Sequence, residues 1–249
     1  FTAYSLRALN SAYTGPLIRV LSDGDEQDIY AKADGSLDTV ALLNFVGTGD
    51  GFVRIWYDQS GAGNDITQNE ASKQPKMVNS GSTILKNGLP AVEFNGSSTE
   101  FDTSGFFTNQ NYNVIGVGSI DIDDSIMYCF GGGLSTFKTF GTSLNSANTI
   151  GTKYGSSFLS QDYTLGEQVL LFNSYALTAY ESYINSLQST NEIPAFRGGT
   201  ASYKIGSVGS TTSFYLDGTI QEFIVYESNQ LPNREGIETN INDYYTIYE

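Results

Sequence analysis

The chain of 249 residues contains no histidine and a single cysteine, Cys129. Without histidine it lacks the commonest general base, the commonest transition-metal ligand and the side chain that titrates near neutral pH. One cysteine excludes an intrachain disulfide and a zinc site built from thiolates, so oxidising and reducing compartments are both allowed. Any acid–base chemistry must therefore rely mainly on carboxylates.

Positive charge and long apolar runs are scarce as well. Lys and Arg number 12 against 27 Asp and Glu, which gives a net charge of −15. This charge would repel a phosphate backbone or anionic lipid headgroups, and it is typical of a solubilising surface. No apolar run approaches the ~20 residues of a membrane-spanning helix, and the first residues lack the basic and apolar regions of a signal peptide. We therefore expect neither nucleic acid nor a membrane as partner.

The abundant residues predict an all-β fold. Glycine occurs 27 times, tyrosine 17 times and phenylalanine 15 times, a composition typical of many short strands joined by turns. Strand signals recur over residues 52–57, 91–94, 114–120, 127–130, 169–175, 178–185, 203–208 and 218–226. The last of these is mostly apolar, with Gln221 and Glu222 near its start, as expected of a strand covered on both faces. Sandwiches of this length commonly form one domain, and without a repeat or linker we expect a single domain over residues 1–249.

Three short helices are predicted. Residues 4–10 place Leu6 and Leu9 at helical spacing before the Gly15-Pro16 pair. A second helix begins after Asp38 as N-cap, with Leu37 and Leu42 as a hydrophobic staple, and ends at Gly47. The third closes the chain, with Pro232 in its first turn and Ile237, Ile241 and Tyr244 on one face.

Two sequence runs carry a family resemblance. The first is SAYTGP at residues 11–16, and the second is WYDQSGAGND at residues 56–65, where an aromatic strand enters a polar turn. In the second run Gly61 and Gly63 allow positive φ, and Asp58 and Asn64 can bond to nearby backbone. In this order the runs resemble the catalytic domain of fungal-type α-L-arabinofuranosidase B and looser relatives in secreted bacterial and phage proteins. The C-terminal strand and helix resemble laminin-G-like domains. The resemblance implies a concanavalin-A-like jelly roll, an all-β sandwich with a few short helices, and a sugar ligand.

The catalytic carboxylates of that family are missing at the matching positions. The family resemblance implies a nucleophilic Glu in a mid-domain strand and an acidic Asp after a Gly-Gly pair, as glycoside hydrolysis requires. Residues 154–161 match the first strand without a Glu, and Ser210 stands where the Asp is expected. A hydroxyl protonates a leaving group poorly because its pKa is too high. Displaced carboxylates remain open, namely Asp162, Glu167 and Glu181, against the alternative that each is a solvated surface acid.

Sugar binding without hydrolysis needs an aromatic face and planar polar side chains. The second run offers Trp56, Tyr57, Asp58, Gln59 and Asn64, and the matching groove adds Tyr128, Ser210 and Thr211. The alternative is that Trp56 and Tyr57 are core strand residues, while Asp58 and Gln59 hydrogen-bond the backbone of their own loop.

Calcium is a possible cofactor, because concanavalin-A-like domains often hold it with carboxylates and loop carbonyls. The candidates are Asp23, Asp25 and Asp28 in one acidic loop, and Asp121 and Asp123, which share one face at strand spacing. Exposed turn chemistry is the alternative for both sets.

The leading hypothesis is a non-catalytic, carbohydrate-recognising or surface-display module of a secreted bacterial protein or a phage virion, located outside the cell or on a cell or virion surface. Its expected partner is a glycan or polysaccharide, displayed multivalently in a larger assembly. The alternatives are an α-L-arabinofuranosidase-like hydrolase and a purely structural capsid or fibre appendage. The missing Glu and Asp separate the first two hypotheses.

Overall fold

The computed structural model describes residues 1–103, 112–122, 128–131, 138–142, 149–154, 157–175, 180–188, 204–207 and 215–249. The strands in chain order are β1 (Thr2–Ser5), β2 (Ile18–Ser22), β3 (Asp25–Ile29), β4 (Gly51–Trp56), β5 (Ile66–Thr67), β6 (Lys76–Asn79), β7 (Ser82–Thr83), β8 (Leu85–Lys86), β9 (Leu89–Pro90), β10 (Val92–Asn95), β11 (Phe101–Asp102), β12 (Tyr112–Ile120), β13 (Tyr128–Gly131), β14 (Lys138–Thr142), β15 (Thr149–Tyr154), β16 (Ser157–Asp162), β17 (Val169–Tyr175), β18 (Tyr180–Ile184), β19 (Leu187–Gln188), β20 (Lys204–Ile205) and β21 (Asp217–Tyr226). The helices are α1 (Thr39–Val46) and α2 (Arg234–Tyr245), with the short 3₁₀ helices η1 (Ala71–Lys73) and η2 (Leu231–Asn233).

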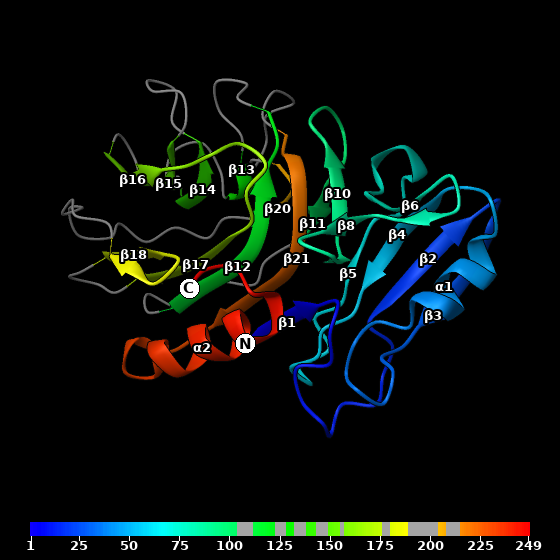
Figure 1. Cartoon of the computed structure of the whole chain (residues 1–249), viewed down its shortest axis with the longest axis horizontal. Coiled ribbons are helices and arrows are strands. Elements are labelled where there is room, and N and C mark those ends of the chain that lie inside the picture. Colours follow the sequence, from blue (N-terminus) through cyan, green and yellow to red (C-terminus); the bar gives the residue numbers. More distant parts are fainter. Residues whose placement is uncertain are drawn as a thin grey trace.

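The strands form two main antiparallel sheets (Figure 1). Within the described residues the large sheet runs β19-β18-β17-β12-β21-β10-β6-β4-β2-β3, and β1, β5 and β7 pair with β21, β4 and β6 beside this path. The smaller sheet runs β11-β20-β13-β14-β15-β16, and β8 and β9 form a separate hairpin. The predicted all-β sandwich of antiparallel sheets with a few short helices is thus confirmed.

β21 lies at the centre of the large sheet. Most of its length pairs with β12, from Asn113 opposite Tyr226 to Ile120 opposite Gly218. Along its other edge, β10 pairs with the first half, and β1 pairs with the second half, so that Ser5 lies opposite Glu222. The N-terminal and C-terminal strands are therefore neighbours at the centre of the fold.

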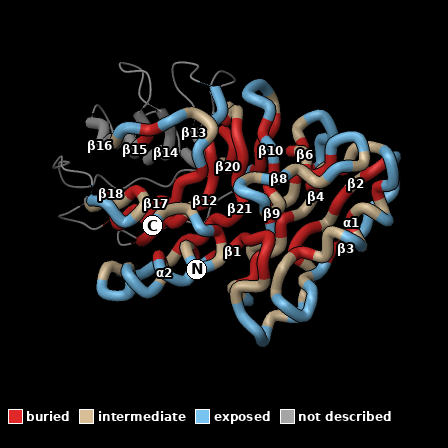
Figure 2. The backbone as a smooth tube through the Cα atoms, in the orientation of Figure 1, coloured by how far each residue is buried: buried red, intermediate tan, exposed pale blue. Residues whose placement is uncertain are grey.

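The large sheet is covered on both faces, as Figure 2 shows for its central strands. One hydrophobic core includes Val114, Leu171 and Phe223 from the large sheet with Phe101 and Ile205 from the small one. A second core packs Ile115, Phe172 and Ile224 against Ile241 and Tyr245 of α2. Because successive side chains of a strand point to opposite faces, strands buried on both sides read as continuous apolar runs. β21, with eight consecutive buried residues, confirms the expectation of a strand covered on both faces.

α1 follows its predicted boundaries. The Asp38 carboxylate caps it by accepting a hydrogen bond from the Ala41 amide at 3.0 Å, and Gly47 ends it. Leu37 and Leu42, the predicted staple, are both buried in the core between the sheets. The closing helix is also present, with Pro232 in η2 and with Ile241 buried. Its buried face additionally holds Glu238 and Tyr245, which the helical spacing of the apolar residues did not indicate.

The predicted helix at residues 4–10 is wrong. Residues 2–5 form β1, which pairs antiparallel with β21. Leu6 is buried in one core, and Leu9 packs against the other, so their spacing reflects two separate contacts. The acidic stretch that begins at Asp23 was expected to be a loop, yet most of it forms the strand β3, paired with β2.

No helix within the described part of the chain is long and apolar enough to cross a membrane.

Candidate functional site

The turn after β4 is built around the buried carboxylate of Asp58. Oδ1 accepts hydrogen bonds from the amides of Ala3 at 2.9 Å and Ser60 at 3.0 Å. Oδ2 accepts from Ser60 Oγ at 2.8 Å and from the Asn64 amide at 3.1 Å. Gly61 and Gly63 have φ angles of 82° and 74°, which lets the chain curl around this carboxylate. Asp58 therefore organises its own loop and attaches that loop to β1.

Gln59 attaches the same loop to the N-terminal segment. Its Oε1 accepts from the Leu9 amide at 2.9 Å, and its Nε2 donates to the carbonyls of Ser5 at 3.1 Å and Arg7 at 2.9 Å. Gln59 is 7% exposed, so these three bonds are made almost out of contact with water. One amide side chain thus joins the loop after β4 to the backbone of residues 5–9.

The aromatic residues of the run lie deeper. Trp56 is fully buried, with its ring 6.2 Å from that of Tyr4 and 6.4 Å from that of Phe101, and it presents no face to solvent. Tyr57 is half-buried, and its hydroxyl donates to Asp28 at 2.8 Å. Asn64 is half-buried, and its carbonyl accepts from the Tyr4 hydroxyl. The ligand-binding roles predicted for this run stay predictions, and the observed contacts are those of the structural alternative.

A cleft of about 710 Å³ opens beside this loop. Its walls come from the N-terminal segment, the loop, β21, η2 and α2, with polar groups supplied by Asn10, Gln59, Ser60, Asn233 and Asn240. Its apolar lining includes Tyr226, Pro232 and Ile237. A cavity of this size lies within the ~300–1,000 Å³ of small-molecule sites.

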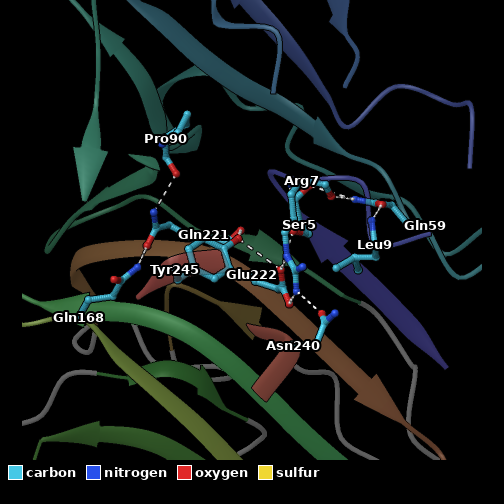
Figure 3. A network of polar contacts seen from close by, with 10 residues as sticks. All are labelled: Ser5, Arg7, Leu9, Gln59, Pro90, Gln168, Gln221, Glu222, Asn240 and Tyr245. Atoms are coloured by element: carbon cyan, nitrogen blue, oxygen red, sulfur yellow. Dashed lines mark hydrogen bonds and ion pairs between the residues drawn. The ribbon is translucent and has the colours of Figure 1, made fainter. Parts of the chain in front are cut away.

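A buried ion pair forms part of the lining of this cleft, and Figure 3 shows it with its neighbours. Arg7 Nε donates to Glu222 Oε2 at 2.9 Å, and Arg7 Nη2 donates to Glu222 Oε1 at 3.2 Å. The same Nη2 also reaches Asn240 Oδ1 on α2 at 2.9 Å. The Glu222 carboxylate accepts two further bonds, from Ser5 Oγ at 2.8 Å and from the Tyr245 hydroxyl at 3.2 Å.

Two groups bonded to Glu222 have raised pKa values, namely Arg7 and Tyr245. Burial would lower the pKa of Arg7, but the charge and hydrogen bonds of Glu222 outweigh burial and raise it. Burial raises the pKa of Tyr245 well above its usual value, and the Glu222 charge adds to this effect. The guanidinium also lies over the Tyr244 ring, 4.9 Å from its centroid. At neutral pH the Arg7 guanidinium therefore keeps its charge.

Other buried acids are held in a similar way. Glu100 accepts from Lys204 Nζ at 2.7 Å and from Ser207 Oγ at 2.6 Å. Glu238 is bound by Arg234 and by Ser186 Oγ, and burial raises its pKa. The sequence pattern gave no signal for either acid. The partners of Glu100 lie about one hundred residues away in the sequence. Glu238 lies on α2, whose apolar spacing already predicts an amphipathic helix without it.

The three candidate displaced carboxylates lie on separate elements. Asp162 ends β16 and is exposed, and Glu167 is exposed in the turn before β17. Glu181 in β18 is half-buried and accepts from the Tyr183 hydroxyl at 2.6 Å. Tyr128 lies in β13, opposite Gly141, and Ser210 and Thr211 fall outside the described residues.

The calcium candidates do not converge in the part of the chain that the structure describes. Asp23 occupies the turn between β2 and β3, and Asp25 and Asp28 lie within β3. Asp28 is bound by Arg19 through two bonds of 2.7 and 2.8 Å, and Asp121 pairs with Lys86 at 3.0 Å. Asp123 lies outside the described ranges, and within them no three acidic or cysteine side chains form a metal-binding group. Calcium binding stays a prediction.

Comparison with known proteins identifies a related family and related folds. The profile of a family described as "Alpha-L-arabinofuranosidase B, catalytic" matches residues 1–99, which contain both N-terminal runs and the Asp58 loop. The chain is similar to the catalytic domain of α-L-arabinofuranosidase B. This confirms the resemblance stated from the sequence. No curated protein matches the chain by sequence.

Solved α-L-arabinofuranosidases share the fold. A crystal structure of an arabinofuranosidase with arabinofuranosyl-α-1,2-xylobiose has a TM-score of 0.72 at 17% identity, over 96% of this chain and 61% of that one. A GH54 α-L-arabinofuranosidase soaked with a cyclic sulfate inhibitor gives 0.72 at 16% identity, over 96% of this chain and 62% of that one. Trypanosoma rangeli sialidase in complex with sialic acid gives 0.55 at 14% identity, over 77% of this chain and 31% of that one. At these sequence identities the structural similarity shows the fold alone. This chain spans about three fifths of the length of the two arabinofuranosidases.

Proposed function

We propose that this chain is a carbohydrate-recognising module that binds a glycan without hydrolysing it. The observation that carries the proposal is the composition of the cleft beside the Asp58 loop. Glu222 is the one carboxylate among its lining residues, and Arg7, Ser5 and Tyr245 occupy its oxygens. Hydrolysis of a glycosidic bond usually needs two carboxylates across the bond, about 5–10 Å apart. The described residues that line the cleft lack this pair.

What the cleft offers is hydrogen bonding. Asn10, Asn233 and Asn240 are exposed amides, able to donate and to accept, on three different segments around it. Tyr226 and Pro232 supply apolar surface of the kind that packs against the C–H groups of a sugar ring. Similarity to arabinofuranosidase catalytic domains supports a sugar as the ligand.

The proposal includes display on an extracellular, cell or virion surface, where weak contacts act multivalently. A few polar contacts to one sugar give low affinity, and linked copies multiply it through effective concentration. The net charge of −15 favours neutral over anionic glycans.

Two measurements test the proposal. A glycan-array screen of the purified chain, with and without calcium, should give neutral glycans as ligands. A chromogenic aryl α-L-arabinofuranoside should remain uncleaved. Asn233→Ala, an exposed change in η2, should weaken binding about threefold through the loss of one hydrogen bond, without a large fall in the thermal midpoint.

The other outcomes separate the alternatives. Clear wild-type turnover that is abolished by Asp162→Asn, Glu167→Gln or Glu181→Gln would replace the proposal with the hydrolase. An array without any ligand, together with no turnover, would leave the structural appendage as the function.

A further inference from the structure

A second pocket lies between residues 8–15 and residues 30–35, with a volume of about 570 Å³. Tyr13 and Tyr30 stand on its opposite walls, so it is called the tyrosine pocket. Most residues of the SAYTGP run at residues 11–16 line this pocket, and none of them is among the residues that line the first cleft. Asn10 lines both cavities, so the two are neighbours.

The first wall is held rigidly by its own backbone. The Asn10 side chain accepts from the Ala12 amide at 2.8 Å, and the Asn10 carbonyl accepts from the Tyr13 amide at 3.0 Å. The Tyr13 hydroxyl donates to the Pro16 carbonyl at 2.7 Å. A Cβ on Gly15 would lie 2.8 Å from Tyr13 Cζ, so the ring packs directly on the Gly15 backbone. The absence of a side chain at Gly15 therefore allows the Tyr13 ring to pack in this position.

The second wall is a tight turn fixed to the first. Gly35 N donates to the Lys32 carbonyl at 2.9 Å, and the Asp34 carboxylate accepts from the Ser36 amide at 2.9 Å. The Ala8 amide donates to the Gly35 carbonyl at 2.7 Å and joins the two walls. A pocket assembled in this way loses little conformational freedom when a ligand enters.

The groups that face the pocket suit an uncharged, hydroxyl-rich ring. Tyr30 is 48% exposed and lines the pocket, so its ring is accessible to a ligand. Ser11 and Thr14 are exposed, and within the described structure their hydroxyls make no hydrogen bond, so they are available to a ligand. Lys32 Nζ lies 3.7 Å from Asp34 Oδ2, so these two lining residues form an ion pair. The pocket therefore combines an aromatic face and free hydroxyls with one paired cation and anion among its lining residues.

We infer that the tyrosine pocket binds one neutral sugar residue, with its C–H face on Tyr30 and its hydroxyls bonded to Ser11 and Thr14. This inference rests on the proposed function, because it names a sugar subsite of the same glycan-binding chain. Asn10, which lines both cavities, makes the pocket a second subsite beside the cleft for a glycan of two or more residues.

The test titrates the ¹⁵N-labelled chain with three neutral probes, arabinobiose, xylobiose and cellobiose, and with the anionic sialyllactose. Amides of residues 10–15 and 30–35 should shift with at least one neutral probe and remain unchanged with sialyllactose. Tyr30→Ala should weaken binding about tenfold, the equivalent of one lost ring contact, and Thr14→Val should weaken it about threefold. Leu187→Ala, an exposed apolar change that lines neither cavity, is the control and should leave the shifts of residues 30–35 in place. Both pocket changes lie at exposed positions, so an unchanged thermal midpoint verifies folding.

Each result decides between the two proposals. Neutral-sugar binding that Tyr30→Ala leaves intact would overturn the subsite and leave the proposed function standing. No binding of any neutral glycan, here or on the array, would overturn both. Sialyllactose that shifts the pocket amides as strongly as a neutral probe would overturn the stated ligand class.

Discussion

Arg7 and Glu222 form a bidentate, buried ion pair although they lie 215 residues apart in the sequence. Arg7 is 8% exposed, and Glu222 is fully buried. The pair connects the end of β1 to the centre of β21, and Asn240 and Tyr245 extend it to α2. The network therefore joins the end of β1, the strand β21 and the helix α2 at a single point in the lining of the cleft.

Breaking this pair should destabilise the chain strongly. Glu222→Gln leaves a buried guanidinium without its counter-charge, and the free energy of unfolding should fall by about 3–5 kcal/mol. The double change Arg7→Met with Glu222→Met should cost less than Arg7→Met or Glu222→Met alone. Urea denaturation measures the double-mutant cycle. Lys32→Ala, which removes an exposed pair, is the control and should change the free energy by less than about 0.5 kcal/mol. Additive single effects would show that the pair is not coupled.

The Asp58 carboxylate should matter to stability more than any exposed acid. Asp58→Ala leaves the amides of Ala3, Ser60 and Asn64 without an acceptor, which should cost about 1–3 kcal/mol. Thermal unfolding measures this loss, with Asp243→Ala on the exposed face of α2 as control. A normal midpoint combined with lost glycan binding would instead make Asp58 a recognition residue.

Acid should weaken the chain partly through Asp28. The hydrogen bonds from Arg19 are the largest cause that lowers the pKa of this carboxyl, and the Tyr57 hydroxyl adds to them. A lowered folded pKa stabilises the fold above the unfolded value of about 3.9, and this stabilisation is lost as the pH falls through the folded pKa. The difference in thermal midpoint between wild type and Asp28→Asn should therefore be largest at pH 6 and shrink at pH 3. A difference that is constant with pH would rule out this linkage.

Gly206 should tolerate no side chain. Its φ is 87°, and a Cβ there would lie 2.3 Å from Cδ1 of the buried Phe94 ring. Gly88 has a similar φ of 77° but nothing within 4 Å of the same position. Gly88→Ala therefore measures backbone strain alone, about 1–2 kcal/mol, and Gly206→Ala adds about 1–3 kcal/mol of overpacking. Equal losses in denaturant unfolding would show that Phe94 yields without cost.

The elements predicted correctly are those with local causes. α1 has its cap, staple and terminating glycine within residues 37–47, so sequence alone defined it. The strands at residues 114–120 and 169–175 are long apolar runs, and β17 has the predicted bounds. The helix at residues 4–10 failed because pairing of β1 with a strand more than two hundred residues away overrides local spacing.

The candidate site follows the same division. The loop-organising contacts of Asp58 were foreseen as an alternative, since Asp in a glycine-rich turn commonly bonds nearby backbone. Gln59 was expected to bond its own loop, but it bonds the backbone of residues 5–9 instead. The ion pair was not foreseen. The sequence marked Glu222 only as a polar residue in an apolar strand, and nothing near Arg7 indicated its partner. The tyrosine pocket also needed the structure, because Tyr13 and Tyr30 line one pocket only when residues 8 and 35 are joined.

The central place of β21 has a consequence for how fast the chain folds. β21 pairs with β1, β10 and β12, so the middle of the large sheet cannot close until its most distant segments have met. The loop-closure entropy of such contacts is lost before their packing energy is gained. We therefore expect slow folding, on the order of milliseconds to seconds or longer, with a high relative contact order. During synthesis, β1 stays without its partner until more than two hundred further residues have been made.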